Sequence, residues 1–263
     1  MRGRYLLLGA APAALAAVGL FTLAGRGPRE GAPSQPAASA PVGPDTPVQP
    51  QSPTHPPDPG LGVVIAAQGT AAGAPACAQC HAFNGVSDAS GAFPRIAGQS
   101  ADYLAEQLRD FASGVRSNAL MSPIAKALTP DDVADVAAYY AGVDGPVLPL
   151  KAPDPALVKL GETLATVGDA RRQLQSCNNC HGPGGVGEPP AIPYLAGQYD
   201  RYIDFTLREW QRGFRKNSPN QMAVVAGKLD EQEIAAVAAY YQQVLSTPKA
   251  AKTQPKESDD ARR

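Results

Sequence analysis

The chain has few of the side chains that build most enzyme and metal sites. Its 263 residues include four cysteines, three histidines and three methionines, one of them the initiator. Charge of one sign is also lacking: 23 basic against 24 acidic residues exclude the basic face that nucleic-acid binding needs. No alternating, strand-like pattern occurs, and the apolar residues recur at helical spacing, which predicts an all-α fold. The arrangement of the few cysteines and histidines therefore carries the functional information.

All four cysteines fall in two C-x-x-C-H pentapeptides, at residues 77–81 and 177–181, 100 residues apart. This motif is typical of covalent haem c attachment, in which both thiols add to haem vinyl groups and the adjacent histidine ligates the iron. A zinc ribbon would hold its cysteine pairs roughly 15–20 residues apart, and a thioredoxin-like motif needs no following histidine. Two covalently bound haem c groups are therefore predicted. Their attachment residues are Cys77, Cys80, Cys177 and Cys180, with His81 and His181 as proximal iron ligands.

The sequence around these motifs forms an internal repeat of two copies. Residues 94–118 match 193–217 at a constant offset of 99, and Val-Ala-Ala-Tyr-Tyr at 136–140 recurs at 237–241. Each copy holds one haem motif, which indicates two domains that arose by internal duplication. We expect domain 1 to cover residues 61–147 and domain 2 residues 148–245, with the boundary in the Pro- and Gly-containing stretch 145–155.

Each copy has the local signals of several helices. Apolar helices are predicted over 60–69 and 155–168, ahead of the two motifs, and a middle helix after Gln99 and after Gln198. The last helix of copy one opens at Thr129, followed by proline and two aspartates, and that of copy two opens at Asp230. Capping residues with acids in the first turn are typical of helix N-termini.

The two internal methionines occupy equivalent places. Met121 and Met222 lie 40 and 41 residues beyond His81 and His181, one in each copy. A thioether sulfur is a common second axial ligand of haem iron and raises its reduction potential. Filling core space is the alternative role of a methionine, but it does not account for the matched spacing. We therefore predict Met121 and Met222 as iron ligands.

Both ends of the chain differ from the repeats. A basic start and an uncharged stretch over 5–25 predict export, with residues 1–27 as a signal-anchor or signal peptide. The stretch reaches the ~20 residues that span a bilayer, which favours an uncleaved anchor. Residues 28–60 are predicted to form a Pro-rich flexible linker, in which His55 is a solvated residue instead of an iron ligand. Residues 246–263 are predicted to be a disordered charged tail.

Four shared motifs resemble class I cytochrome c domains, and the pair is similar to the dihaem cytochrome c4 family. They are C-x-x-C-H, then Pro-x-x-Ala-Gly-Gln, then Gly-x-Arg-x-Asn before each methionine, and the closing Ala-Ala-Tyr-Tyr, and they span roughly 60–245. The resemblance implies two tandem class I cytochrome c domains. It also implies that the carbonyls of Pro94 and Pro193 accept the Nδ1–H of the haem histidines. Ile96 and Leu195 would then pack on the porphyrins.

Arg116 and Arg215 recur in both copies and are candidates to bind haem propionates, because guanidinium and carboxylate match in geometry. A solvated arginine at a helix end is the alternative for each. Both readings stay open from the sequence.

The expected function is electron transfer, not catalysis, because both axial positions of each iron would be filled. We expect single electrons to pass through a periplasmic respiratory chain, between a quinol-oxidising cytochrome bc-type complex and a terminal oxidase. The anchor would place the protein on the periplasmic side of the bacterial inner membrane, and without it the protein would be soluble there. Two alternatives remain: a cytochrome subunit of a membrane-bound dehydrogenase, and a dihaem redox enzyme such as a peroxidase or a thiosulfate-oxidising cytochrome.

Overall fold

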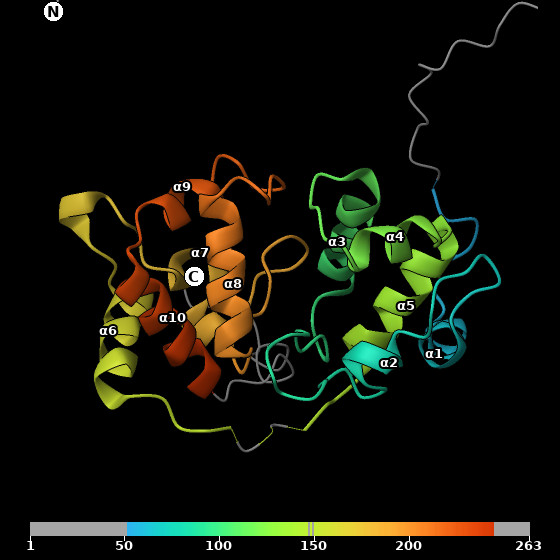
Figure 1. Cartoon of the computed structure of the whole chain (residues 1–263), viewed down its shortest axis with the longest axis horizontal. Coiled ribbons are helices and arrows are strands. Elements are labelled where there is room, and N and C mark those ends of the chain that lie inside the picture. Colours follow the sequence, from blue (N-terminus) through green and yellow to red (C-terminus); the bar gives the residue numbers. More distant parts are fainter. Residues whose placement is uncertain (1–51, 147, 149, 245–263) are drawn as a thin grey trace, which may run out of the picture. The chain divides into compact units, whose positions relative to one another are not determined.

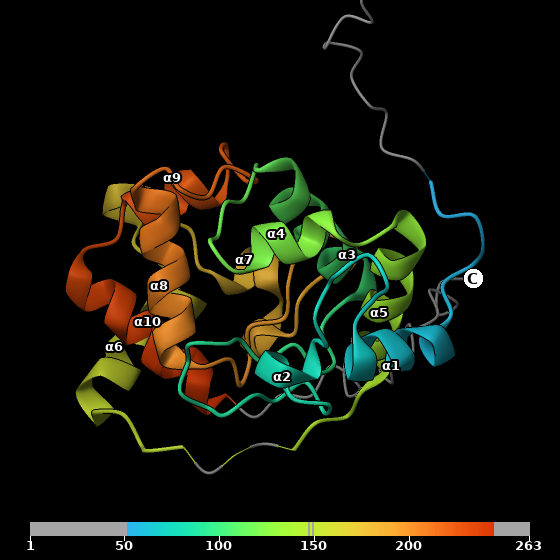
Figure 2. The same cartoon turned by 45° about the vertical axis from the view of Figure 1, so that its right-hand side comes forward.

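The computed structural model describes residues 52–146, 148 and 150–244. Within these ranges the chain forms helices and three isolated β-bridges, so the predicted all-α fold is confirmed. The N-terminal half (residues 52–146) contains α1 (Pro59–Gln68), α2 (Ala78–His81), α3 (Ala101–Ser113), α4 (Met121–Lys126) and α5 (Pro130–Gly142). The C-terminal half (residues 150–244) repeats the order with α6 (Pro155–Thr166), α7 (Asn178–His181), α8 (Asp200–Gln211), α9 (Met222–Gly227) and α10 (Glu231–Gln243). Figures 1 and 2 show the two sets of helices.

The predicted last helices begin at the expected caps. The Thr129 hydroxyl accepts from the backbone N–H of Asp132, whose carboxylate accepts from the backbone of Thr129. Asp230 and Glu233 form the same reciprocal arrangement at the start of α10. Such a capping box satisfies two backbone donors that a helix N-terminus otherwise leaves unpaired. The starts of α5 and α10 are therefore fixed by local sequence.

In each half the first and last helices cross at a glycine. Helix α1 packs against α5, and α6 against α10. A Cβ atom on Gly62 would lie 2.1 Å from the carbonyl oxygen of Asp135, and one on Gly161 would lie 2.0 Å from that of Ala236. No side chain fits at that separation, so the crossings depend on the absence of a Cβ.

The core of each half surrounds its C-x-x-C-H segment. In the N-terminal half, Ile65, Val136 and Tyr140 are buried together, and Cys77 packs against them. In the C-terminal half, Cys177 packs against a larger cluster. Its members include Leu164, Leu207, Trp210, Ile234, Val237 and Tyr241. The helix crossing and the haem motif of each half therefore share one apolar core.

The residues just before α1 are fastened to α5. The backbone N–H of Thr54 donates to Asp131 Oδ1 at 2.6 Å, and the backbone N–H of Asp58 donates to Asp135 Oδ1 at 2.7 Å. His55 is partly covered there, with Nε2 3.7 Å from Asp135 Oδ2. The expected spacer 28–60 thus ends earlier than its composition suggested, because Asp58 caps α1 and Pro59 starts it. The rest of that spacer lies outside the described residues.

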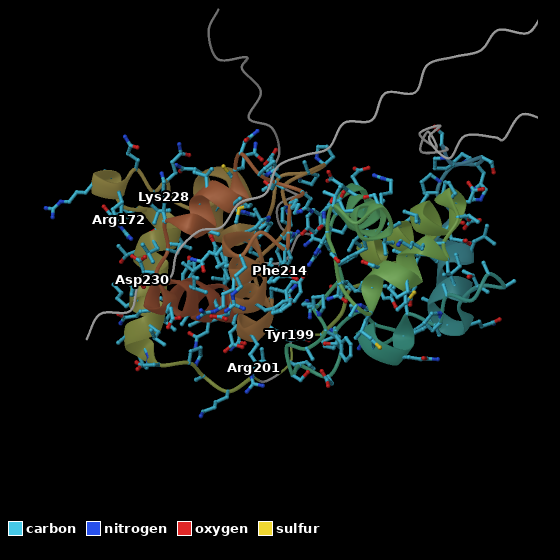
Figure 3. The ribbon with its side chains drawn as sticks, turned by 45° about the horizontal axis from the view of Figure 1, so that its top comes forward. Arg172, Tyr199, Arg201, Phe214, Lys228 and Asp230 are labelled. Atoms are coloured by element: carbon cyan, nitrogen blue, oxygen red, sulfur yellow. The ribbon has the colours of Figure 1, made fainter. Side chains whose placement is uncertain are left out.

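The C-terminal half has a short feature that the N-terminal half lacks. Helix η1 (Ala170–Arg172) precedes the second motif, and Arg172 pairs with Asp169 and with Glu233 of α10. Arg172 also donates to the carbonyl oxygen of Lys228 at 3.1 Å, and the two basic residues lie near each other in Figure 3. This contact links the loop before the motif to the turn between α9 and α10.

Among the described residues, no helix combines the length and the apolar character needed to cross a membrane. The segment 5–25, where an anchor is expected, lies outside these residues.

Replacing Gly161 with alanine should lower the free energy of unfolding by about 1–3 kcal/mol, because the added methyl group overpacks the α6–α10 crossing. Guanidinium denaturation of the haem-loaded protein measures the change. Gly142→Ala is the control, since a Cβ there meets nothing within 4 Å. Equal stability of the two variants would contradict a close crossing at Gly161.

Candidate functional sites

Both C-x-x-C-H segments form a single helical turn. The backbone N–H of Cys80 and that of His81 donate to the carbonyl oxygen of Cys77 at 3.2 and 2.9 Å, and the turn at Cys177 repeats both distances. No disulfide joins the four cysteines; the first of each pair is partly buried and the second exposed. Within the described ranges, no group of three His, Cys, Asp or Glu side chains gathers as a metal-ion site. The four cysteines are therefore not assembled as a zinc site.

The histidine of each motif is buried and held by a proline carbonyl. Nδ1 of His81 lies 3.3 Å from the carbonyl oxygen of Pro94, and Nδ1 of His181 lies 2.9 Å from that of Pro193. Burial lowers the pKa of both imidazoles, which favours the neutral ring that binds a metal. Because Nδ1 is engaged by the carbonyl, Nε2 is the nitrogen available to ligate iron.

The proline loop is anchored to the chain that leaves the haem turn. The backbone N–H of Ile96 donates to the carbonyl oxygen of Gly85, and that of Leu195 donates to the carbonyl oxygen of Gly185, both at 2.8 Å. Ile96 and Leu195 are partly buried and pack against the cores of their halves. Each loop thus offers one aliphatic side chain beside the core and one carbonyl to the histidine.

Tyrosines of the last helices hold the haem turns. This role of the tyrosine hydroxyls was not predicted from the sequence. The hydroxyl of Tyr139 donates to the carbonyl oxygen of Phe83 at 2.7 Å, and that of Tyr140 to the carbonyl oxygen of Ala82 at 3.2 Å. In the C-terminal half, the Tyr241 hydroxyl donates to Asn178 Oδ1 at 2.8 Å. The repeated Tyr-Tyr was the available signal. Its hydroxyls connect α5 and α10 to the cysteine-bearing turns.

Met121 and Met222 each begin a short helix, α4 and α9. Asn118 Oδ1 accepts the backbone N–H of Met121 at 2.9 Å, and Ser218 Oγ accepts that of Met222 at 3.3 Å. Both methionines are partly buried, and Met222 packs against the core of its half. The structure thus gives them equivalent places in the two halves.

Arg116 and Arg215 are buried where the two halves meet. Their backbones form an isolated antiparallel bridge. Arg116 Nη2 donates to the Tyr202 hydroxyl at 2.9 Å, and Arg215 Nη2 donates to the Tyr103 hydroxyl at 3.0 Å. The alternative of solvated arginines is therefore wrong, because the two side chains cross between the halves. Tyr103 and Tyr202 have a polar role there.

Unpaired polar atoms near this contact suit a haem carboxylate. Among the described residues, four buried side-chain atoms have no hydrogen-bond partner: Arg116 Nε, Thr206 Oγ1, Glu209 Oε2 and Trp210 Nε1. The two N–H donors, on Arg116 and Trp210, fit an anionic propionate. Glu209 does not, although burial raises the pKa of its carboxyl and so favours the uncharged acid. The cysteine pair of each turn, the buried imidazole held at Nδ1 and these buried donors together fit haem c.

Comparison with known proteins identifies both halves. The family described as "Cytochrome c" matches residues 66–143, and that described as "Cytochrome C oxidase, cbb3-type, subunit III" matches residues 169–240. A cytochrome c4 from Pseudomonas aeruginosa is 36% identical over 187 residues, which are 69% of this chain and 91% of that protein. A "Thiosulfate dehydrogenase electron acceptor" from Stutzerimonas stutzeri is 40% identical over 170 residues, 64% of this chain and 79% of that one.

Solved structures of the same kinds of protein are also similar to this chain. Reduced cytochrome c4 from Pseudomonas stutzeri has a TM-score of 0.64 at 32% identity, covering 72% of this chain and 99% of that chain. The thiosulfate dehydrogenase TsdBA of Marichromatium purpuratum has a TM-score of 0.66 at 40% identity over 77% of this chain. This chain spans 43% of that longer protein. Two cytochrome c halves, each with its own C-x-x-C-H motif, carry two covalent haem c groups.

Removing one cysteine pair should remove one haem. The variant Cys77→Ala with Cys80→Ala should carry one haem per chain in place of two, because no thioether can form in the N-terminal half. Intact mass and the pyridine haemochrome spectrum, each set against protein concentration, measure the ratio. Gln79→Ala lies between the two cysteines and should keep both haems. Two haems on the cysteine variant would contradict attachment at this motif.

Proposed function

Because this chain belongs to the cytochrome c4 family and is a dihaem electron carrier, we propose that it serves a periplasmic respiratory chain, passing single electrons from a quinol-oxidising cytochrome bc-type complex to a terminal oxidase. The observation that carries the proposal is the pair of buried histidines, each held by a proline carbonyl, one in each of two connected halves. We propose that one half receives electrons from the donor and that the other half passes them to the acceptor.

We propose His81 with Met121, and His181 with Met222, as the axial ligands. When bound, each haem supplies a one-electron couple between ferric and ferrous iron. The protein holds each imidazole in one orientation through the carbonyl of Pro94 or Pro193. With a histidine and a methionine both holding the iron, no position would remain there for a substrate, in keeping with a carrier. Arg116, through its unpaired Nε, and Arg215 are proposed to face haem propionates.

The charges of the two halves support different docking partners. The N-terminal half has 4 basic and 9 acidic residues, a net of −5, whereas the C-terminal half has 10 of each, a net of 0. An acidic surface attracts a basic partner over distances of about a Debye length, roughly 8–10 Å. We infer that the N-terminal half docks on a basic surface and that the C-terminal half accepts a partner with less charge.

A second electron source is favoured by the relatives. Proteins named as electron acceptors of thiosulfate dehydrogenase are 38–40% identical to this chain. The chain could therefore take electrons from a thiosulfate dehydrogenase, with the same haem sites and a different docking partner. In this role it remains a carrier, and the oxidation of thiosulfate belongs to the partner.

A role in a periplasmic respiratory chain also requires a particular location in the cell. We propose that it works in the periplasm, held to the inner membrane by residues 5–25. The mass of the mature protein tests this directly, because a cleaved signal removes these residues and an anchor retains them.

The dithionite-reduced protein should not bind carbon monoxide, because methionine fills the sixth position of both irons. Its Soret band should stay unchanged after carbon monoxide is added. Met121→Ala and Met222→Ala should each open one iron, so that about half of the haem in either variant binds the gas. Binding by the unaltered protein would contradict at least one methionine ligand.

The electron source can be decided by reduction kinetics. The oxidised protein is mixed either with a cytochrome bc complex and quinol or with a thiosulfate dehydrogenase and thiosulfate, and the reduced haem band is followed. If docking uses the acidic N-terminal half, the rate with the true partner should fall as salt increases. Reduction by the dehydrogenase alone would replace the bc complex as the proposed donor.

A further inference from the structure

A glutamine of each half binds the haem-ligand loop of the other half. The backbone N–H of Arg95 donates to Gln198 Oε1 at 2.9 Å, and Gln198 Nε2 donates to the carbonyl oxygen of Arg95 at 2.8 Å. Reciprocally, Gln99 Oε1 accepts the N–H of Tyr194 and its Nε2 donates to the carbonyl oxygen of Tyr194, both at 3.0 Å. Each side-chain amide therefore pairs with both backbone polar groups of one residue in the opposite half.

The residues bound in this way are next to the proline carbonyls that hold the haem histidines. The carbonyl of Pro94 and the N–H of Arg95 are the two ends of one peptide group. That carbonyl accepts from Nδ1 of His81, while the N–H is bound by Gln198. A single peptide unit thus connects the imidazole of the N-terminal half to a side chain of the C-terminal half.

The C-terminal half has the same connection of histidine, peptide group and glutamine, and here the glutamine comes from the N-terminal half. The carbonyl of Pro193 accepts from Nδ1 of His181 at 2.9 Å, and the N–H of the same peptide group, on Tyr194, is bound by Gln99. In both connections one peptide group lies between the histidine of one half and the glutamine of the other.

Both glutamines are themselves fixed in place. They are 7% and 8% exposed, and the Oε1 atoms of Gln99 and Gln198 also accept the N–H of Ser100 and of Tyr199, respectively. Tyr199, labelled in Figure 3, adds a contact between the halves, since its hydroxyl donates to the carbonyl oxygen of Val86. A buried amide with its partners satisfied keeps one orientation, because any rotation would leave polar groups unpaired.

We propose that Gln99 and Gln198 are positioning residues that tune the haem of the opposite half. A peptide whose N–H is hydrogen bonded becomes a better acceptor at its carbonyl, by roughly 10–30% per bond. A stronger carbonyl draws the Nδ1 proton and makes the imidazole a more basic iron ligand, which favours ferric iron. Each glutamine therefore lowers the reduction potential of the haem across the contact. The inference rests on the proposed ligation by His81 and His181.

Gln198→Met should raise the potential of the haem attached at Cys77 and Cys80 and leave the other haem nearly unchanged. Methionine keeps the length of the side chain but cannot form the two amide hydrogen bonds. Gln99→Met should do the reverse, and Gln232→Met, on the exposed side of α10, should shift neither haem. Spectroelectrochemical titration measures the potentials. Haem methyl resonances, assigned to each half by contacts with neighbouring residues, show which haem has changed.

A shift in the haem of the glutamine's own half, or in neither haem, would overturn the proposal. If Gln198→Met does not fold with both haems, Gln198→Asn is measured instead, because its amide is one methylene too short to reach Arg95. The electrode needs no protein partner, so these potentials do not depend on which donor or acceptor is correct. Conversely, each glutamine variant could shift the potential of the opposite haem as expected while no tested partner exchanges electrons with the protein. That result would count against the proposed respiratory role alone.

Discussion

The hydrogen bond from each buried histidine to a proline carbonyl is the constraint around which both halves are built. It orients the ring, leaves Nε2 for the metal and requires a loop that returns to the haem turn. The other features of each half serve this geometry. The loop is anchored on Gly85 or Gly185, the turn is held by tyrosines of the last helix, and that helix is set by its crossing at a glycine.

The contact between the halves includes these same loops. The two cytochrome c halves are therefore not independent of each other. Buried arginines reach across to tyrosines, and buried glutamines bind backbone next to the ligand-holding carbonyls. A network of this kind keeps its geometry only while every member is satisfied. The contacts are therefore reciprocal, and each half completes the surroundings of the other's haem loop.

The sequence predicted those features that depend on neighbouring residues. Haem attachment needs a fixed local spacing, so C-x-x-C-H was sufficient to predict it, and the starts of α5 and α10 followed from capping residues. The contact of Gln198 with Arg95 spans 103 positions and depends on how the halves pack, which no local pattern encodes. The attachment of residues 54–58 to α5 was missed for another reason: the composition of residues 28–60, taken as a whole, indicated a flexible linker and gave no sign of contacts with Asp131 and Asp135.

The attachment of residues 54–58 to α5 has a mechanical consequence. Any tension on the chain that precedes Thr54 is borne first by Asp131 and Asp135, in the first turns of α5, before it reaches α1. The far end of the same helix carries Tyr139 and Tyr140, whose hydroxyls hold the first haem turn. Helix α5 thus connects the point where residues 54–58 attach to the fold with the turn that bears the first haem motif, so both are held by one rigid element.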